Sequence, residues 1–260
     1  MSIQIGITER GDGGLDLSWE QKLDTVDGAI IITKCLVNKA LHDALLRHKD
    51  KLILHAGITG NGGTVYEPRV RSYSESLDAL QELIDHGFPT SHIVLRCDPI
   101  IPNTDSLSNM ETMLKDFLSR NMGINRVRIS ILDNYPHVRE RFANAGINVL
   151  YNGYFQPVPS QFLDIAMRLT TIFAGHDDIE LECCAEPKLQ EAANKFGLKP
   201  IKACGCCGTT DVAILGLQMP STDNLNPQNR KGCLCLNCKK ELLTNPKPCP
   251  HKCIYCYWKD

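Results

Sequence analysis

Three cysteines near the carboxyl terminus form the pattern with the clearest chemical meaning in this 260-residue chain. Cys249, Cys253 and Cys256 follow the spacing C-x3-C-x2-C, and Tyr255 directly precedes the last of them. Thiolates are soft ligands that bind zinc, copper(I) and iron–sulfur clusters. A structural zinc ion needs four protein ligands, and a cubane cluster is normally held by four thiolates. Three thiolates leave one metal position open, which favours a 4Fe–4S cluster that binds a further molecule; the alternative is a share in a larger zinc or structural cluster site.

A second group of cysteines precedes this loop in two short segments. Its members are Cys204, Cys206, Cys207, Cys233, Cys235 and Cys238. Six thiols exceed what one cluster needs, and two interpretations stand side by side. Four of them supply an auxiliary iron–sulfur cluster that passes electrons or anchors the C-terminal segment, or they form a zinc knuckle that folds a tail too short for its own core. Reduced cysteines without a ligand, or a redox pair, are the remaining readings, and the spacing does not choose between zinc and iron.

The composition favours metal binding in a reducing compartment. Of the 13 cysteines, all but Cys35 and Cys97 lie after residue 182, and such clustering favours metal ligation over disulfides. Those two are expected to be small buried side chains. The net charge of −2 provides no basic surface for nucleic acid. No apolar run approaches the about 18 residues of a membrane span, and the N-terminus lacks the apolar core of a signal peptide, so we expect a cytoplasmic protein without a membrane partner.

Short apolar runs alternate with longer amphipathic ones through the first two-thirds of the chain. The short runs are rich in Ile, Val and Leu, as buried parallel strands are. The predicted strands cover residues 3–7, 29–33, 52–55, 93–97, 127–132, 179–184 and 200–203. The predicted helices cover residues 19–26, 38–48, 74–86, 106–120, 136–145 and 160–174. Six or seven β-α units predict an α/β fold: a (β/α) barrel, partial or circularly permuted relative to a TIM barrel, or a doubly wound sheet.

Polar residues gather where the predicted strands end, and both architectures place their binding sites there. The candidates for cofactor and substrate contacts are Arg10, Lys34, Arg96, Asp98, Ser130, Glu182 and Glu186. Residues two apart share one face of a strand, so Arg96 and Asp98 should point the same way, as should Glu182, Cys184 and Glu186. Charged groups are costly to bury, and a ring of them suits a polar ligand, although single polar residues after strands also cap helices.

The chain divides into a (β/α) barrel domain, residues 1–203, and a cysteine-rich metal-binding segment, residues 204–260, packed on the barrel mouth. If the site lies at the carboxyl ends of the strands, the three-cysteine loop must reach that mouth. The expected route takes the segment across the rim, where the second cysteine group pins it.

The C-x3-C-x2-C spacing, with an aromatic residue before the third cysteine, resembles the radical SAM superfamily. The resemblance implies that the open iron chelates the amino and carboxylate groups of S-adenosylmethionine. It also implies that an electron cleaves the sulfonium to a 5′-deoxyadenosyl radical, and that a flavodoxin or ferredoxin supplies this electron. In that superfamily the motif normally follows the first strand, whereas here it lies near the carboxyl terminus.

Further motifs resemble a bacterial family of unknown function with a radical-SAM-like cysteine cluster at the C-terminus. They span nearly the whole chain and are Ile58-Thr59-Gly60, Glu67-Pro68, Arg96-Cys97-Asp98-Pro99, Ser130, Asp133, Tyr135, Cys184-Ala185-Glu186, Asn229-Arg230 and Cys233-Leu234-Cys235. Arg10-Gly11-Asp12 and Thr33-Lys34 match the family's first motifs only in part. The family implies a fold and a cofactor but no substrate; remote similarity to spore photoproduct lyase-type enzymes extends the expectation from a small molecule to a nucleobase or nucleoside.

Two functional hypotheses follow. The first is a radical SAM enzyme in which Cys249, Cys253 and Cys256 hold the cluster, while arginine and lysine side chains bind carboxylates. The second is a zinc- or iron–sulfur-stabilised protein that binds a ligand or senses redox state without cleaving S-adenosylmethionine.

Overall fold

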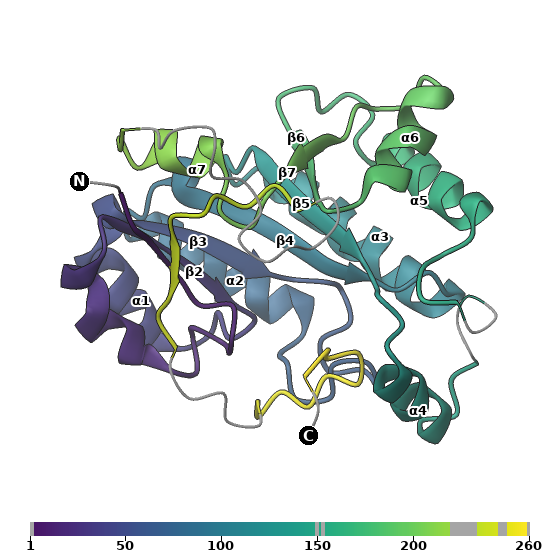
Figure 1. Cartoon of the computed structure of the whole chain (residues 1–260), viewed down its shortest axis with the longest axis horizontal. Coiled ribbons are helices and arrows are strands. Elements are labelled where there is room, and N and C mark those ends of the chain that lie inside the picture. The colour runs from purple at the N-terminus through teal and green to yellow at the C-terminus, as the bar shows by residue number, and fades with distance from the viewer. Residues whose placement is uncertain (1–2, 149–150, 152–153, 219–232, 244–248, 259–260) are drawn as a thin grey trace.

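The computed structural model describes residues 3–148, 151, 154–218, 233–243 and 249–258. Its centre is one parallel sheet of eight strands in the order β7-β6-β5-β4-β3-β2-β1-β8. The strands are β1 (Ile5–Ile7), β2 (Gly28–Thr33), β3 (Leu52–Gly57), β4 (Ile93–Ile100), β5 (Arg126–Ile131), β6 (Glu180–Cys184), β7 (Lys202–Cys204) and β8 (Lys239–Glu241). The sheet curls into a half-barrel with helices around it (Figure 1). The predicted α/β fold is confirmed as a half-barrel of parallel strands.

Helices connect successive strands, as the β-α rhythm of the sequence predicts. The α-helices of the described residues are α1 (Lys39–Arg47), α2 (Tyr73–Asp85), α3 (Thr104–Arg120), α4 (Pro136–Asn144), α5 (Pro159–Ile172), α6 (Pro187–Lys195) and α7 (Thr209–Ile214). The short 3-10 helices are η1 (Leu17–Thr25), η2 (Lys49–Lys51) and η3 (Thr90–His92).

The two faces of the sheet bury different partners. Along β2 and β3, Ile31 and Leu54 belong to the large core shared with the outer helices. Their neighbours Ile30 and Ile53 point to the other face, into a smaller core inside the half-barrel. This alternation follows from the two-residue period of a strand. The inner core also contains Val212 of α7 and several cysteines of the second group, so the half-barrel encloses sulfur-rich packing.

Local signals explain the helices that the sequence predicts well. In α2, the Ser72 hydroxyl accepts a hydrogen bond from the backbone N–H of Glu75, and the Glu75 carboxylate accepts one from the backbone N–H of Ser72. This capping box satisfies donors that a helix start leaves free. Leu77 and Leu80 are fully buried along the predicted apolar stripe.

Several elements differ from the sequence prediction. Residues 19–26, predicted as a helix, lie largely in the 3-10 helix η1, which Trp19 ties down by donating from Nε1 to the Gly13 carbonyl at 2.7 Å. The elements α6, α7 and β8 were not predicted. The β8 sequence, Lys-Lys-Glu, carries no apolar run; it becomes a strand because its backbone pairs with β1. The cysteine-rich segment therefore contributes a strand to the sheet. None of the helices in the described ranges has the length and apolar character that a bilayer crossing requires.

Candidate functional site

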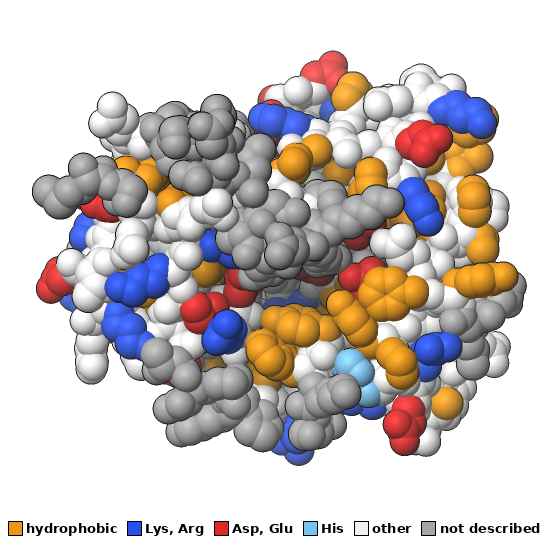
Figure 2. Space-filling model, in the orientation of Figure 1, with side chains coloured by type: hydrophobic (Ala, Val, Ile, Leu, Met, Phe, Trp, Pro, Cys, Tyr) orange, Lys and Arg blue, Asp and Glu red, His pale blue; other side chains and the backbone are white. Residues whose placement is uncertain are grey.

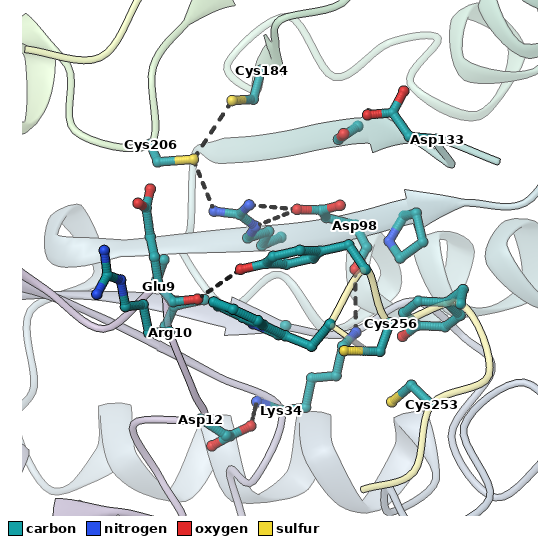
Figure 3. Close-up of a pocket in the computed structure, with 18 of the residues that line it drawn as sticks. Glu9, Arg10, Asp12, Lys34, Asp98, Asp133, Cys184, Cys206, Cys253 and Cys256 are labelled. Atoms are coloured by element: carbon teal, nitrogen blue, oxygen red, sulfur yellow. Dashed lines mark hydrogen bonds and ion pairs between the residues drawn. The ribbon is translucent and has the colours of Figure 1, made fainter. Parts of the chain in front are cut away.

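A cavity of about 590 Å³ opens at the carboxyl ends of the strands. Figure 2 shows it as a hollow in this face of the molecule, with apolar side chains along one rim. Cys184 and cysteines of both groups line it, the latter being Cys206, Cys233, Cys235, Cys249, Cys253 and Cys256. Figure 3 shows Cys184 and Cys206 on one side and Cys253 and Cys256 on the other. The two cysteine groups, separate in the sequence, thus share one cavity.

The loop that carries Cys249, Cys253 and Cys256 is anchored to the strand ends on one side. His251 Nε2 lies 3.0 Å from the Asp12 carboxylate, which follows β1. The backbone N–H of Ile254 donates to the Tyr66 carbonyl at 3.1 Å, and the Tyr255 hydroxyl donates to Glu67 Oε1. Burial alone would raise the pKa of Asp12, but the hydrogen bonds from His251, Thr33 and Lys34 hold that pKa below its usual value. Buried, charged partners therefore fix this side of the loop.

The other side of the loop is held by its backbone carbonyls. Arg141 of α4 donates to the carbonyls of Cys256, at 2.6 Å, and Trp258, at 2.8 Å. His137 of α4 lies 2.9 Å from the Tyr257 carbonyl. The loop thereby spans the mouth from the end of β1 to α4 (Figure 1).

Lys34 lies inside the cavity, but its ammonium group already has partners. It donates to Glu67 Oε1 at 3.0 Å and to the Asp98 carbonyl at 3.2 Å, and it lies 5.7 Å from the Tyr255 ring centre. Thr59 donates to the same Glu67 oxygen at 2.7 Å. Although burial opposes the charge, Glu67 raises the pKa of Lys34. Lys34 therefore joins β2, the segment after β3 and the cysteine loop.

Arg96 and Asp98 point the same way from β4, as predicted, and bind each other. Arg96 donates to Asp98 Oδ2 from Nε, at 2.8 Å, and from Nη2. Its third nitrogen, Nη1, lies 3.5 Å from Cys206 Sγ and 3.5 Å from His55 Nδ1. The guanidinium thus connects the β4 carboxylate to the second cysteine group. Arg10, the remaining predicted cation, lines the exposed rim.

Of the three predicted candidates on or just after β5 and β6, Ser130 lines the cavity, whereas Glu186 and Glu182 do not. Ser130 lines the cavity and donates to Glu186 Oε1 at 3.3 Å. Glu186 is buried, accepts a further hydrogen bond from the backbone N–H of Ile131 at 2.9 Å and is not among the lining residues. Burial raises the pKa of Glu186 to about 7. The expected shared face ends at Cys184 because the strand stops there and Ala185 takes a left-handed backbone with φ 58°.

Glu182 also lies away from the cavity lining, in a buried ion-pair cluster inside the half-barrel. It accepts from Arg126 Nε at 3.1 Å and from Arg128 Nε at 2.8 Å. Asp211 of α7 shares Arg126 at 2.9 Å. Despite burial, Arg128 and Arg126 hold the pKa of Glu182 below its usual value. Its charge is balanced by these arginines, so it holds α7 and two strands together.

Within the second cysteine group, Cys206 is the central thiol. Its Sγ lies 3.5 Å from Cys184 Sγ, and its backbone N–H donates to Cys235 Sγ at 3.2 Å. Glu9, Cys206 and Cys235 form the one group in the described residues whose three potential ligand atoms all lie within 4.8 Å. Hydrogen bonds from Cys184 and Cys235 hold the pKa of Cys206 well below its usual value, despite burial. These residues can hold one metal ion.

The other predicted members of that group do not converge on this point. Cys207 and Cys238 hydrogen-bond each other. Cys204 donates to the Cys183 carbonyl at 3.3 Å. These three are not among the residues that line the cavity, whereas Cys233 is.

Among the described residues, the thiols of the C-terminal loop do not form a close-set site for a single ion. Two tetrahedral zinc–sulfur bonds of about 2.3 Å place their sulfurs only about 3.8 Å apart. In the described part of the chain, the only close-set group of three ligand atoms excludes Cys249, Cys253 and Cys256. In a cubane each thiolate binds its own iron, so wider spacing is expected. Burial raises the pKa of Cys249, and that of Cys253 to about 12, so metal binding there would release protons.

Several residues that build the site are not among the candidates that the sequence predicts. Glu9, Asp12, Glu67, Tyr255 and His251 carry the loop anchors or line the cavity. Asp12 and Glu67 stand in the segments singled out after strands one and three, so their positions were visible. Their partners, His251 and Tyr255, could not be inferred, because they lie far away in the sequence.

A family model described as domain of unknown function DUF1848 matches residues 18–258. The chain belongs to this family. No curated protein matches the chain. The DUF1848 match covers both cysteine groups and all the strand ends except that of β1, so it contains most of the cavity lining but not the segment from Thr8 to Asp12.

Proposed function

We propose that this DUF1848 protein is a radical SAM enzyme whose 4Fe–4S cluster is held by Cys249, Cys253 and Cys256. One observation carries the proposal: these three thiols line a cavity at the carboxyl ends of a parallel half-barrel, on a loop anchored from both sides. When bound, such a cluster would offer an open iron to the amino and carboxylate groups of S-adenosylmethionine and the electron that cleaves its sulfonium to a 5′-deoxyadenosyl radical.

The residues of the chain would bind, orient and shield the reactants. Arg10 at the rim is suited to a carboxylate. Asp133 and Ser130 line the opposite strand ends and are suited to ammonium or hydroxyl groups. Lys34 and Arg96 act chiefly as positioning residues, because Glu67 and Asp98 engage them. Hydrogen abstraction by a carbon radical needs no side-chain base, which agrees with a cavity whose charged groups are largely paired.

The order of the parts is consistent with a circularly permuted barrel, since the cluster loop follows the strands. We propose a small-molecule or nucleoside-type substrate, a flavodoxin- or ferredoxin-type electron donor and a cytoplasmic location. The cavity of about 590 Å³ falls within the usual range for a bound cofactor or substrate.

The test begins with full-length protein purified without oxygen. Iron, acid-labile sulfide and 5′-deoxyadenosine formation with reductant and S-adenosylmethionine are measured for the wild type and for Cys253→Ala. We expect the variant to lose nearly all cluster iron and all cleavage, because one of three protein ligands is gone. Cys97→Ala is the control, since this buried thiol packs in the outer core, and it should keep both.

Unchanged iron content in Cys253→Ala would refute the assignment. Cleavage by the wild type can require bound substrate, so the metal content decides when no 5′-deoxyadenosine forms.

A further inference from the structure

We propose that Cys206, Cys235 and Glu9 bind a single zinc-like divalent cation that joins the two edges of the half-barrel. This inference does not depend on the proposed radical chemistry. It concerns the opposite side of the cavity from Cys253 and Cys256 (Figure 3).

The spacing of the donor atoms fits one ion. The ligand atoms of Glu9, Cys206 and Cys235 all lie within 4.8 Å of one another. Cys184 Sγ lies 3.5 Å from Cys206 Sγ, but it is outside this close-set group, so it is a neighbour of the ligands and not one of them. A cubane would separate the thiolates further, because each would bind a different iron. Soft sulfur together with one carboxylate is a donor set that zinc accepts.

Neighbouring cations orient the ligands. Lys239 Nζ contacts Glu9 Oε2 at 2.7 Å, and Arg96 Nη1 lies 3.5 Å from Cys206 Sγ. Such outer contacts fix metal ligands in orientation and are typical of protein metal sites. The Cys206 side chain is nine-tenths or more buried, and so is that of Cys235. Several anionic ligands in a buried place need nearby positive charge, and a divalent cation would complete it.

The positions of the ligands in the sheet give the ion a structural role. Cys206 follows β7 by two residues, and Cys235 precedes β8 by four. These strands are the opposite edges of the sheet, and Glu9 follows β1, the neighbour of β8. The backbone already approaches here: Leu236 N–H donates to the Cys207 carbonyl at 2.9 Å, and a Cβ on Gly205 would lie 2.6 Å from the Cys235 nitrogen. One ion would therefore join the two edges without a β7–β8 ladder.

The remaining cysteines of the group provide internal controls. Cys204 and Cys238 lie in the same two segments but do not line the cavity. A zinc knuckle built from any four nearby thiols would use them, whereas the proposed site would not.

The experiment measures zinc and iron per chain in full-length protein purified without oxygen and loaded with zinc. We expect Cys206→Ser and Cys235→Ser each to lower zinc affinity by at least about tenfold, with iron unchanged. Cys204→Ser should bind zinc as the wild type does, and Cys253→Ala should lose iron but keep zinc. Unchanged zinc binding in Cys206→Ser and Cys235→Ser would overturn the site. Loss of iron and sulfide instead of zinc in these variants would also overturn it and indicate a second cluster.

A measurement on the unaltered chain keeps the proposal testable if those variants fail to fold. X-ray absorption at the zinc edge should give two sulfur ligands at about 2.3 Å, with oxygen ligands at about 2.0–2.2 Å. Four sulfurs, or no sulfur, would contradict the ligand set. Because this spectrum reports zinc alone, its outcome is separate from that of the cluster test.

Discussion

The two cysteine groups face each other across one cavity and are built in opposite ways. The C-terminal loop is held through its backbone and through side chains between its cysteines, by His251, Tyr255 and the Arg141 contacts. The group around Cys206 is held by the sheet, because its members sit directly beside strand ends and inside the inner core. The first arrangement leaves its thiols spread and presented to the cavity; the second brings donor atoms within 4.8 Å.

The difference shows that cysteine spacing in the sequence does not determine spacing in space. C-x3-C-x2-C, the more compact motif in sequence, is the more open site. Cys206 and Cys235 are 29 residues apart and meet closely, because the two edge strands bring them together. Mutations in the contacts that hold the sheet side should therefore lower the free energy of unfolding more than mutations in the contacts that hold the loop.

The largest effect is expected from the ion-pair cluster inside the half-barrel. Glu182→Ala leaves Arg126 and Arg128 without their main partner in a buried place, which should lower the free energy of unfolding by about 3–5 kcal/mol. Denaturant unfolding measures this. Glu180→Ala, two residues earlier and paired with Lys202 at the surface, should cost less than about 1 kcal/mol. Equal losses in both variants would show that the sheet side is not held by this cluster.

The anchor of the loop should have a smaller and more local effect. Glu67→Ala removes the acceptor shared by Lys34, Thr59 and Tyr255. We expect a loss of about 1–3 kcal/mol together with faster amide exchange in residues 249–258. Glu82→Ala, which breaks only the exposed pair with Lys39, is the matched control. Slow exchange in the loop of Glu67→Ala would show that other contacts suffice.

The interior should also carry a pH dependence, through a buried histidine. His55 lies 3.3 Å from Arg128 Nη1 and 3.5 Å from Arg96 Nη1, and burial with these cations lowers its pKa well below 6.5. Below that pH the unfolded chain binds a proton that the folded chain does not. The contribution of His55 to stability should therefore fall with decreasing pH, by up to about 1.4 kcal/mol per pH unit.

His55→Gln should remove this part of the pH dependence. Denaturant unfolding between pH 7.5 and 5.5 compares the variant with the wild type. Parallel curves for the two proteins would exclude His55 as the titrating group.

The smallest effect is expected on the outer side of the loop. Arg141→Ala removes the donors to the Cys256 and Trp258 carbonyls and should cost about 1 kcal/mol. Amide exchange should rise in residues 249–258 while the strands stay protected. Glu140→Ala truncates an exposed side chain of the same helix and should change the loop less. If both variants behave alike, α4 does not hold the loop.

The sequence was sufficient for the parts of the fold in which local pattern and final structure agree. Apolar runs located β1 to β7, and the strand-end rule located Arg96, Asp98, Ser130 and Lys34 at the cavity. It failed for β8, whose Lys-Lys-Glu sequence has no strand signal, and for Glu182, whose charge is neutralised by Arg126 and Arg128 rather than by a ligand. In both cases the deciding partner comes from another strand, and a single sequence does not show which partner that is.

The pairing of β8 with β1 has a consequence for how the protein is made. The Glu9 backbone N–H donates to the Glu241 carboxylate across 232 positions of the chain. At a synthesis rate of about 5–20 residues per second, β1 waits more than about ten seconds on the ribosome with this edge unpaired. An unpaired edge invites pairing with other chains. Two features limit this here: β1 is only three residues long, and the charged Glu9 follows it by two residues. The cavity cannot assemble until translation has passed β8 and the loop of residues 249–258, so any metal bound there would be inserted after that point.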